Sequence, residues 1–486
     1  MHCEATKVLL MLDNEHWREE CGIIGILNQD QAAHHIYLGL YALQHRGQEA
    51  YGIVTFDQEE QGIEVKECKD FGTVSKKVTQ DDLEKMTGKI GIGHVRYSTQ
   101  GGKLQQNIQP FIFNSSSHGA IAIAHNGNLT NAKILKDQLE KSGSIFTSTS
   151  DSEVLMHLLA KSKKNLLREK IFDVMQQVRG AYALVLLAKD QLYGIRDPFG
   201  FRPLALGKKQ DSWVLASESC AFDLLGMEFV RELQPGEVVR ICDGKSESFF
   251  PLSSPEKSAL CSFEPIYFSR PDSLSKNEFI YQTRKKMGAN LAKEAHIEAD
   301  VVIAVPDSGV PMALGYAQES NIPFEIGLVR NHYVGRTFIQ PYQSSRDFDV
   351  KLKLNPIPLV LKGKKVVVID DSIVRGTTCS KIVCMLREAG AAEIHFRVAS
   401  PPITHSCFYG VSTPDRSKLL AAQKNRDEIC EQLGADTLAY LSMDGLKDAL
   451  GANSTQTHCF ACFDGKYPEP IFQKIPPQAS DLKPFY

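Results

Sequence analysis

The first residue of this chain whose setting points to chemistry is a cysteine that opens an apolar segment. Cys21 stands between Glu20 and the apolar run Gly22–Leu27. Free cysteines are among the most buried residue types, so one interpretation is a small side chain packed in a core. The other is a nucleophile, because a thiol next to a suitable base attacks carbonyl carbon readily. The sequence around Cys21 leaves both interpretations open.

A second candidate site lies where another apolar run ends in two acids. Asp370 and Asp371 are followed by the loop Ser372–Gly376 and by Thr377 and Thr378, which open a predicted helix. Helix N-termini present unpaired N–H groups to phosphate, and the glycine of the loop allows the backbone to approach closely. The two acids suit ribose hydroxyls and a Mg²⁺ ion that carries pyrophosphate. A capped turn with a satisfied acid pair is the alternative.

Two further groups of residues could join such sites. Ser308 follows a strand-like run in "VIAVPDSG", and the carboxyl ends of parallel strands share one edge of a sheet, so it is expected beside the acids. Cys459 and Cys462 form a C-x-x-C pair, which alone fits a redox pair, half of a zinc site or packing. Four thiolates with one such pair hold either zinc or a [4Fe–4S] cluster. The remaining cysteines, including Cys220, Cys379 and Cys384, are expected in the core.

The elements that must position these residues differ between the two halves of the chain. The first half has short apolar runs separated by turns, with two amphipathic helical stretches, which favours an α+β domain with antiparallel sheet. The second half alternates strands and helices, which favours a parallel sheet. The expected strands are 21–27, 51–56, 89–97, 120–127, 181–188, 299–306, 364–371 and 393–401, and the expected helices are 32–46, 150–162, 278–297, 309–320 and 377–390.

Composition excludes several classes of protein. The chain has 486 residues, 43% hydrophobic and 23% charged, with a net charge of −3. This is typical of a globular protein and gives no electrostatic reason to expect nucleic acid or membrane partners. No apolar run approaches the roughly 20 residues of a membrane-spanning helix. Twelve cysteines in so long a chain favour a reducing compartment, and we expect a cytoplasmic protein.

Ten motifs, in order, resemble one family over the chain from Cys21 to about Pro468. "CGIIGI", "LQHRGQE", "GHVRYST", "AHNGNL" and "TSDSE" resemble the glutamine amidotransferase domain of the N-terminal-nucleophile class. "YFSRPDS", "YVGRTFIQP", "DDSIVRGTT", "SPPITH" and "GADTLAYLS" complete a resemblance to the amidophosphoribosyltransferases, in their propeptide- and iron–sulfur-bearing form. The resemblance implies an α+β glutaminase domain in αββα layers, residues 21–255. It also implies an α/β type I phosphoribosyltransferase domain with a parallel sheet, residues 256–470, and a tail, 471–486.

In this family the thiol that matches Cys21 attacks the side-chain amide of glutamine, and the base is the α-amino group of the same residue. A terminal amine titrates near 7.7–8.0, which suits that task at neutral pH. The resemblance therefore implies that residues 1–20, beginning at Met1 or Met11, are a propeptide. It also implies that Asn126 and Gly127 form the oxyanion hole. Of the glutamine-binding residues, Arg96 would pair with the α-carboxylate, Asp151 with the ammonium group, and Gly47 would act through its backbone.

The resemblance also implies site residues in the second half of the chain. The 5-phosphoribosyl pyrophosphate (PRPP) site would include Asp370, Asp371, Ser372, Arg375, Gly376, Thr377, Thr378 and, in a flexible loop, Arg336; Mg²⁺ would be held by Ser308, Asp370 and Asp371. Arg330 and His332 stand where the family usually has Lys and Arg, which makes the charge at the second position pH-dependent. A [4Fe–4S] cluster would be bound by Cys261, Cys407, Cys459 and Cys462.

The resemblance implies an enzyme that makes 5-phosphoribosylamine from PRPP, glutamine and water, the first committed step of purine synthesis, with ammonia passed between the two sites. It also implies purine nucleotide inhibitors and a homotetramer. Two alternatives remain. Another amidotransferase of the same nucleophile class, such as the sugar-phosphate type, would need an isomerase domain in place of "DDSIVRGTT". A PRPP-sensing regulator without catalytic activity would not need Cys21, Arg96, Asn126 and Asp151 together.

Overall fold

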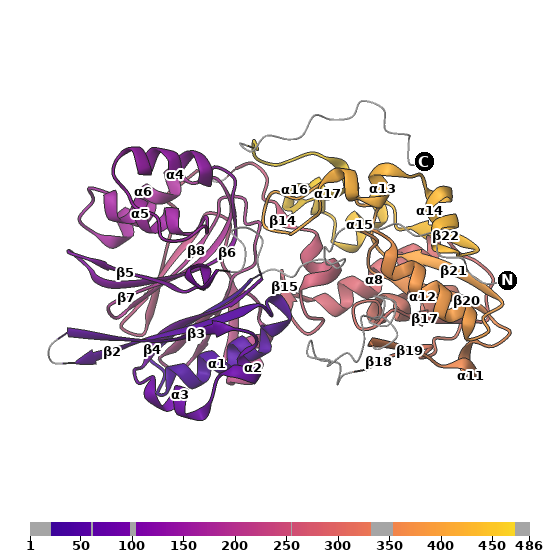
Figure 1. Ribbon diagram of the computed structural model, residues 1–486, viewed down its shortest axis with the longest axis horizontal. Coiled ribbons are helices and arrows are strands. Elements are labelled where there is room, and N and C mark those ends of the chain that lie inside the picture. The colour runs from indigo at the N-terminus through magenta and orange to yellow at the C-terminus, as the bar shows by residue number, and fades with distance from the viewer. Residues whose placement is uncertain (1–20, 60–61, 98–103, 254, 332–352, 472–486) are drawn as a thin grey trace.

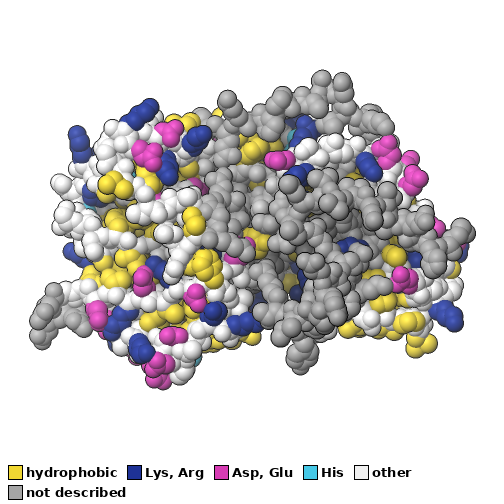
Figure 2. Space-filling model, in the orientation of Figure 1, with side chains coloured by type: hydrophobic (Ala, Val, Ile, Leu, Met, Phe, Trp, Pro, Cys, Tyr) yellow, Lys and Arg dark blue, Asp and Glu magenta, His cyan; other side chains and the backbone are white. Residues whose placement is uncertain are grey.

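The computed structural model describes residues 21–59, 62–97, 104–253, 255–331 and 353–471, which form two lobes (Figure 1). The predicted propeptide, His332, Arg336 and nearly all of the predicted tail lie outside the described residues. On the face drawn in Figure 2, Lys and Arg side chains are interspersed with Asp and Glu over both lobes. In the described part of the chain, no helix is both long enough and apolar enough to cross a membrane.

The first lobe is a stack of two antiparallel sheets, each covered by helices on its outer face (Figure 1). This confirms the predicted αββα layers. Within the described residues, one sheet has the order β11 (Glu228–Glu232), β9 (Ala205–Lys209), β10 (Ser212–Ala216), β1 (Gly22–Leu27), β4 (Ile90–Arg96), β2 (Ala50–Glu59) and β3 (Gly62–Phe71). The other has the order β13 (Lys245–Phe249), β12 (Val238–Cys242), β8 (Gln191–Arg196), β7 (Gly180–Ala188), β6 (Gly119–Leu129) and β5 (Phe111–Ser115).

The apolar run after Cys21 forms β1 because both faces of this strand are covered. Ile23 and Leu27 pack in the core between the two sheets. Ile24 and Ile26 pack on the opposite side, with the helices that cover the first sheet. A strand buried on both faces reads as a continuous apolar run rather than as an alternating one. The helices of this lobe are α1 (Ala32–Ala42), α2 (Val74–Lys77), α3 (Gln80–Lys85), α4 (Ala132–Lys141), α5 (Glu153–Lys161), α6 (Leu167–Gln177) and α7 (Cys220–Leu225).

The second lobe contains the predicted parallel sheet. Its described strands run in the order β17 (Val301–Ala304), β20 (Lys365–Asp370), β21 (Glu393–Val398) and β22 (Thr437–Tyr440), all paired in parallel. One face packs against α8 (Ile280–Glu294) and α9 (Val310–Ser320), and the other against α12 (Thr377–Glu388) and α14 (Arg426–Leu433). The shorter helices are α11 (Pro358–Leu361), α13 (Leu420–Gln423), α15 (Met443–Ala449), α16 (Ser454–Thr457) and α17 (Ala461–Asp464).

Short strand pairs complete the second lobe. β14 (Leu260–Cys261) and β23 (His458–Cys459) pair in parallel, so that Cys261 lies opposite Cys459 although nearly two hundred residues separate them. The segment between β13 and β14 joins the two lobes (Figure 1). The other pairs are β15 (Leu274–Ser275) with β16 (Glu278–Phe279), and β18 (Leu328–Arg330) with β19 (Leu354–Pro356).

Candidate active sites

Cys21 lies at the open end of the first sheet. The antiparallel register of β1 and β4 brings it beside Arg96, the last residue of β4. Its thiol donates to the carbonyl oxygen of Tyr97 at 3.6 Å, and its own carbonyl oxygen accepts from Nε of Arg46 at 3.2 Å. Cys21 is half-buried. The thiol and the backbone carbonyl of Cys21 are therefore each held by a hydrogen bond, while part of the residue stays accessible.

Gly47 occupies a position where no side chain fits. A Cβ at Gly47 would lie 2.7 Å from the amide nitrogen of Arg96 and 2.7 Å from the carbonyl carbon of Val95. The φ of Gly47 is −157°, an extended value open to any residue, so the requirement is for space. A side chain here would displace Arg96 from the end of β4. This contact supports the prediction that Gly47 acts through its backbone.

Asn126 and Gly127 come from β6 in the other sheet, and the two sheets meet close to them. Nε2 of His94, on β4, lies 3.3 Å from the carbonyl oxygen of His125, on β6. Asn126 is only 1% exposed, and its side-chain Nδ2 has no hydrogen-bond partner in the described structure. Leaving a buried donor unpaired costs about 1–3 kcal/mol, unless a ligand supplies the acceptor. An unpaired amide here is what an oxyanion hole requires before substrate binds.

The remaining polar groups of this site are fixed by the backbone and by burial. Oδ2 of Asp151 accepts from the amide of Leu129, at the end of β6, at 2.8 Å. Burial is the main cause that lowers the pKa of His94, to about 3, and it also lowers the pKa of His125. Such weakly basic imidazoles are poor proton acceptors at neutral pH. His94 and His125 instead connect the two sheets through the contact between the His94 ring and the carbonyl oxygen of His125.

A buried group of charges behind Cys21 was not singled out by the sequence. The guanidinium of Arg46 donates to Glu218 at 2.6 Å and to both oxygens of Glu264, at 2.8 and 3.0 Å. Arg202 also lies 3.5 Å from Glu264. All four side chains are at most 3% exposed, and Glu264 belongs to the second half of the chain. Arg46 adjoins Gly47 in the motif "LQHRGQE", but no spacing in the sequence connects it with Glu218 or Glu264.

The carboxyl ends of β17 and β20 bring the second group of candidates together. The hydroxyl of Ser308 donates to Oδ1 of Asp371 at 2.6 Å, and Ser372 donates to the other oxygen of the same carboxylate. The amide of Asp371 donates to Asp370 at 2.9 Å. The sequence expected Ser308 at this edge, and this hydrogen bond places it there.

Both acids of this edge are buried, and their charge needs compensation. Burial raises the pKa of Asp370 well above its ordinary value, and repulsion from Asp371 adds to the effect. Burial also raises the pKa of Asp371, although hydrogen bonds from Ser308 and Ser372 and the nearby charge of Arg284 oppose the shift. Carboxylate and hydroxyl oxygens are the ligands that Mg²⁺ prefers. The donor set therefore fits a magnesium ion, which would stabilise both carboxylates.

The loop after the acids leads directly into α12. Gly376 has a φ of +79°, in the left-handed region, and stands at the N-cap of α12. Thr377 and Thr378 open the helix, so its N-terminal amides follow the carboxyl end of β20, as the sequence predicted. Arg375, in the loop, is half-buried. Arg330 forms an ion pair with Asp307, next to Ser308, which keeps a cation at this edge of the sheet.

The four candidate cluster cysteines line one small cavity. Cys261, Cys407, Cys459 and Cys462 surround it together with aromatic and aliphatic side chains. Burial raises the pKa of the Cys459 thiol to about 12 and also raises that of the Cys462 thiol well above its ordinary value. Of the other cysteines, Cys220 and Cys379 are buried as expected, whereas the prediction for Cys384 was wrong. Cys384 is exposed because it faces solvent from the outer side of α12.

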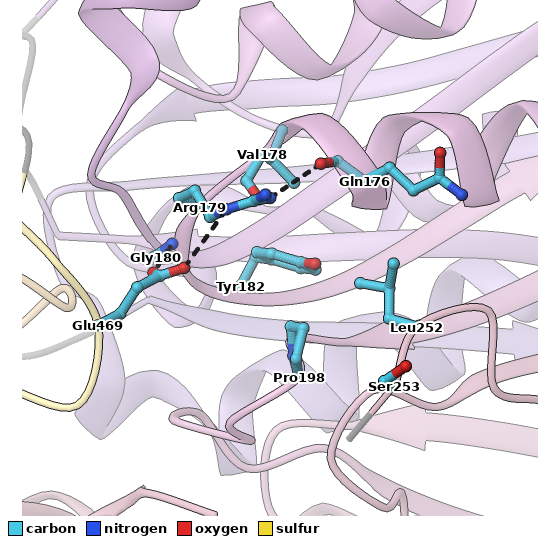
Figure 3. Close-up of a pocket in the computed structure, with 9 residues that line it drawn as sticks. All are labelled: Gln176, Val178, Arg179, Gly180, Tyr182, Pro198, Leu252, Ser253 and Glu469. Carbon is cyan, nitrogen blue, oxygen red and sulfur yellow. Dashed lines mark hydrogen bonds and ion pairs between the residues drawn. The ribbon is translucent and has the colours of Figure 1, made fainter. Parts of the chain in front are cut away.

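The C-terminal segment is attached to the first lobe through Glu469. Its carboxylate accepts from the amide of Gly180 at 2.6 Å and pairs with Arg179 at 3.8 Å, beside a pocket of about 350 Å³ (Figure 3). Burial raises the pKa of Glu469 to about 7, and Asp197 contributes to the shift. A carboxyl group at this contact is therefore bound more favourably when protonated.

Glu469→Gln is expected to change how stability depends on pH. Below about pH 4.5 the carboxyl group of Glu469 is protonated in both the folded and the unfolded state, so it does not make the folding stability depend on pH there. Between about pH 4.5 and 7 the unfolded chain ionises this group while the folded chain keeps its proton, so Glu469 removes stability as the pH rises. The Tm of the wild type should therefore fall relative to that of Glu469→Gln between pH 5 and pH 8, as thermal melts will show. Glu298→Gln, at an exposed site, is the control; equal Tm differences at both pH values would contradict the prediction.

Comparisons with known proteins agree with this division of the chain. A family model described as a glutamine amidotransferase domain matches residues 94–223, and one described as a phosphoribosyl transferase domain matches residues 272–400. Amidophosphoribosyltransferase 1, chloroplastic, of Arabidopsis thaliana is 50% identical, covering 94% of this chain and 80% of the relative. The amidophosphoribosyltransferase of Bacillus subtilis is 46% identical, covering 94% and 95%. That of Methanocaldococcus jannaschii is 44% identical, covering 94% and 99%.

Solved structures give the same result. The glutamine PRPP amidotransferase of B. subtilis complexed with ADP and GMP superimposes with a TM-score of 0.88 at 45% identity, covering 94% of this chain and 99% of that one. A structure described as the allosteric regulatory enzyme of purine biosynthesis superimposes with a TM-score of 0.89 at 46% identity, covering 94% of this chain and 97% of that one. With its two lobes, its two sites and relatives that match it over nearly their whole length, this chain belongs to the amidophosphoribosyltransferase family.

Proposed function

We propose that this protein is a glutamine-dependent amidophosphoribosyltransferase. It makes 5-phosphoribosylamine, pyrophosphate and glutamate from PRPP, glutamine and water, the first committed step of purine synthesis. Membership of the family supports the reaction as a whole. The observation that carries the glutaminase half is the buried Nδ2 of Asn126, which lacks an acceptor next to the sheet end that holds Cys21.

The geometry supports a division of roles in the first lobe. The Cys21 thiol attacks the amide carbon of glutamine, and the oxygen that becomes negative is held by Nδ2 of Asn126 and the amide of Gly127. Ammonia leaves, and water hydrolyses the γ-glutamyl thioester to glutamate. Arg96 binds the α-carboxylate and Asp151 the α-ammonium group. The base is the α-amino group of Cys21, which requires that residues 1–20 have been removed.

In the second lobe, ammonia that has passed from the first site displaces pyrophosphate from C1 of the ribose. Asp370, Asp371 and Ser308 would hold Mg²⁺ and the ribose hydroxyls, and a bound Mg²⁺ would supply positive charge for the leaving pyrophosphate. The loop and helix start bind phosphate through Ser372, Arg375, Gly376, Thr377 and Thr378, while Arg336 lies outside the described residues. We place the boundary between the domains at residues 255–256, in the segment that joins β13 to β14.

The discriminating experiment is a glutaminase assay on purified protein with and without PRPP. The proposed function requires glutamate release that PRPP stimulates and that is matched by pyrophosphate release. Glutaminase activity that responds to a sugar phosphate instead would indicate the other amidotransferase type. PRPP binding without either product would indicate a regulator.

The cysteine cavity supports a metal group, because four thiols from distant parts of the sequence line it. Four thiolates suit either a zinc ion or a [4Fe–4S] cluster. We propose the cluster, as the family resemblance implies. Bound by Cys261, Cys407, Cys459 and Cys462, a cluster would cross-link β14, β23, α17 and the loop that carries Cys407.

Anaerobically purified protein is accordingly expected to be brown and to contain iron and acid-labile sulfide in equal amounts. Cys459→Ser should lose both and become markedly less stable, because buried thiols without a metal cannot replace the cross-link. Cys384→Ser, at an exposed position on α12, should keep them and serves as the control. Elemental analysis measures the outcome; one zinc per chain, or full activity with no metal, would contradict the cluster.

Regulation by nucleotides is also part of the proposal. One relative is described as complexed with ADP and GMP and another structure as an allosteric regulatory enzyme, which supports purine nucleotides as inhibitors of this enzyme. We also propose a homotetramer, as the family resemblance implies. We also propose a reducing compartment such as the cytoplasm, because a chain of 486 residues with twelve cysteines does not have the composition of a secreted disulfide scaffold.

A further inference from the structure

One segment of the second lobe lies directly against the residues proposed as the oxyanion hole. Gly410 has a φ of +107°, and a Cβ there would lie 3.0 Å from Nη2 of Arg202, 3.1 Å from the carbonyl carbon of Gly127 and 3.2 Å from the Cα of Gly127. One residue further along β6, Nδ2 of Asn128 donates to the carbonyl oxygen of Phe408 at 2.9 Å. Two consecutive residues of β6 are therefore contacted by residues 408–410, which lie at least 280 positions away in the sequence.

The segment is itself held firmly. The carbonyl oxygen of Tyr409 accepts from Nε of Arg202 at 3.0 Å, and its ring stacks on Phe201 with centroids 4.1 Å apart. Its hydroxyl donates to the carbonyl oxygen of Glu469 at 2.9 Å. Through Glu469, the opposite strand β7 is held as well, at Gly180. The segment is thus anchored to both strands of the β6–β7 pair and has little freedom to shift.

Gly127 is confined on its other side too. It has a φ of +147°, and a Cβ at this residue would lie 2.1 Å from the carbonyl oxygen of Ala181 on β7. The backbone of Gly127, whose amide is the proposed oxyanion donor, therefore lies between Ala181 on β7 and Gly410. A donor aimed at an oxyanion contributes only when its direction is fixed before the charge develops.

We infer that Phe408–Gly410 are positioning residues for the oxyanion hole, so that the second lobe completes the glutaminase site. The inference rests on the proposed function, in which Asn126 and Gly127 hold the oxyanion. None of the three residues contributes a side chain to the reacting atoms. They act by fixing the peptide of Gly127 through the backbone of Gly410 and the end of β6 through Asn128.

Gly410→Ala tests this inference. The new methyl group has too little space between Arg202 and the backbone of Gly127. We expect the backbone of Gly127 to shift, so the kcat for glutamine hydrolysis should fall about tenfold, below the 10²–10³ of a lost oxyanion donor. The KM for glutamine, inhibition by the product glutamate and the rate of ammonia-dependent synthesis should stay within about twofold. Gly451→Ala is the matched control: its φ is +97°, but a Cβ there meets nothing within 4 Å. It should show the cost of the strained backbone without the loss of kcat.

A second pair of variants keeps the inference testable if Gly410→Ala does not fold. Asn128→Ser removes the hydrogen bond to Phe408 and should lower the same kcat while sparing the ammonia-dependent rate. Asn131→Ser removes a hydrogen bond of the same length, 2.9 Å, from Nδ2 of Asn131 to the carbonyl oxygen of Gln177, together with the one that its Oδ1 accepts from the amide of Arg179. Neither involves residues 408–410. Asn131→Ser should leave kcat unchanged. Equal effects of Asn128→Ser and Asn131→Ser, or an unchanged kcat in folded Gly410→Ala, would overturn the inference. A wild type without glutaminase activity would instead overturn the proposed function.

Discussion

Cys21→Ala is expected to abolish the synthesis of 5-phosphoribosylamine from glutamine and to leave its synthesis from added ammonia within about twofold of the wild-type rate. Removal of a covalent nucleophile costs about four to six orders of magnitude in kcat. The second reaction is spared because its candidate residues lie at the carboxyl ends of β17 and β20, in the other lobe. Pyrophosphate release with saturating glutamine or with ammonium chloride measures both rates in one preparation.

The control for this variant is Cys384→Ala, at an exposed position on α12, which should retain both activities. The structural contacts of Cys21 explain why Cys21→Ala should affect only the glutamine-dependent reaction. Its backbone carbonyl, which Arg46 holds, is unchanged by the substitution, so the charges of Arg46, Glu218 and Glu264 keep their partners. Loss of both activities in a folded variant would show that the two sites are not separable, and residual glutamine-dependent synthesis would remove Cys21 from the mechanism.

The sequence predicted those parts of the molecule that local patterns encode. The continuous apolar runs of β1 and β20 are buried on both faces, and a run of this kind is visible without any knowledge of partners. The two acids and the glycine that follow β20 are positioned by adjacent residues, so their spacing in the sequence is their arrangement in space. The parallel order of the second sheet follows from its helical crossovers in the same way.

The parts that escaped prediction depend on pairs that are distant in the sequence. Arg46 meets Glu264 across 218 positions, and Asn128 meets Phe408 across 280. No periodicity or motif length connects such residues, because the contact arises only when the two lobes dock. Cys384 was misjudged for the opposite reason. The helix to which it belongs was correctly predicted, but which side of that helix faces solvent depends on the sheet beneath it.

Asp371→Asn is expected to lower both glutamine-dependent and ammonia-dependent synthesis by about a hundredfold or more. Even residues behind the direct ligands of a metal commonly contribute 10–100-fold to affinity or activity, so the loss of a charged ligand should exceed that. Both syntheses use the same PRPP site, so they should fall by the same factor, in contrast to Cys21→Ala. The Mg²⁺ concentration that gives half-maximal activity should also rise, and a magnesium titration of the ammonia-dependent rate measures it.

Although Asp371→Asn should lose activity, its folding stability should not fall. Burial raises the pKa of Asp371, so the folded state disfavours its ionised form above the ordinary carboxyl range, and stability is lost as the pH rises. Asparagine has nearly the same shape, carries no charge and can still accept from Ser308. In EDTA at pH 8 the Tm of Asp371→Asn should therefore equal or exceed that of the wild type.

Asp300→Asn is the matched control for this experiment. Asp300 immediately precedes β17, and its carboxylate accepts from the backbone amide of Lys365, at the amino end of β20. It therefore stands at the opposite edge of the same sheet from Asp371 and is exposed. Both activities of Asp300→Asn should stay within about twofold, while its Tm falls. If Asp371→Asn instead loses stability together with activity, the carboxylate holds the fold together and is no evidence for a cation site.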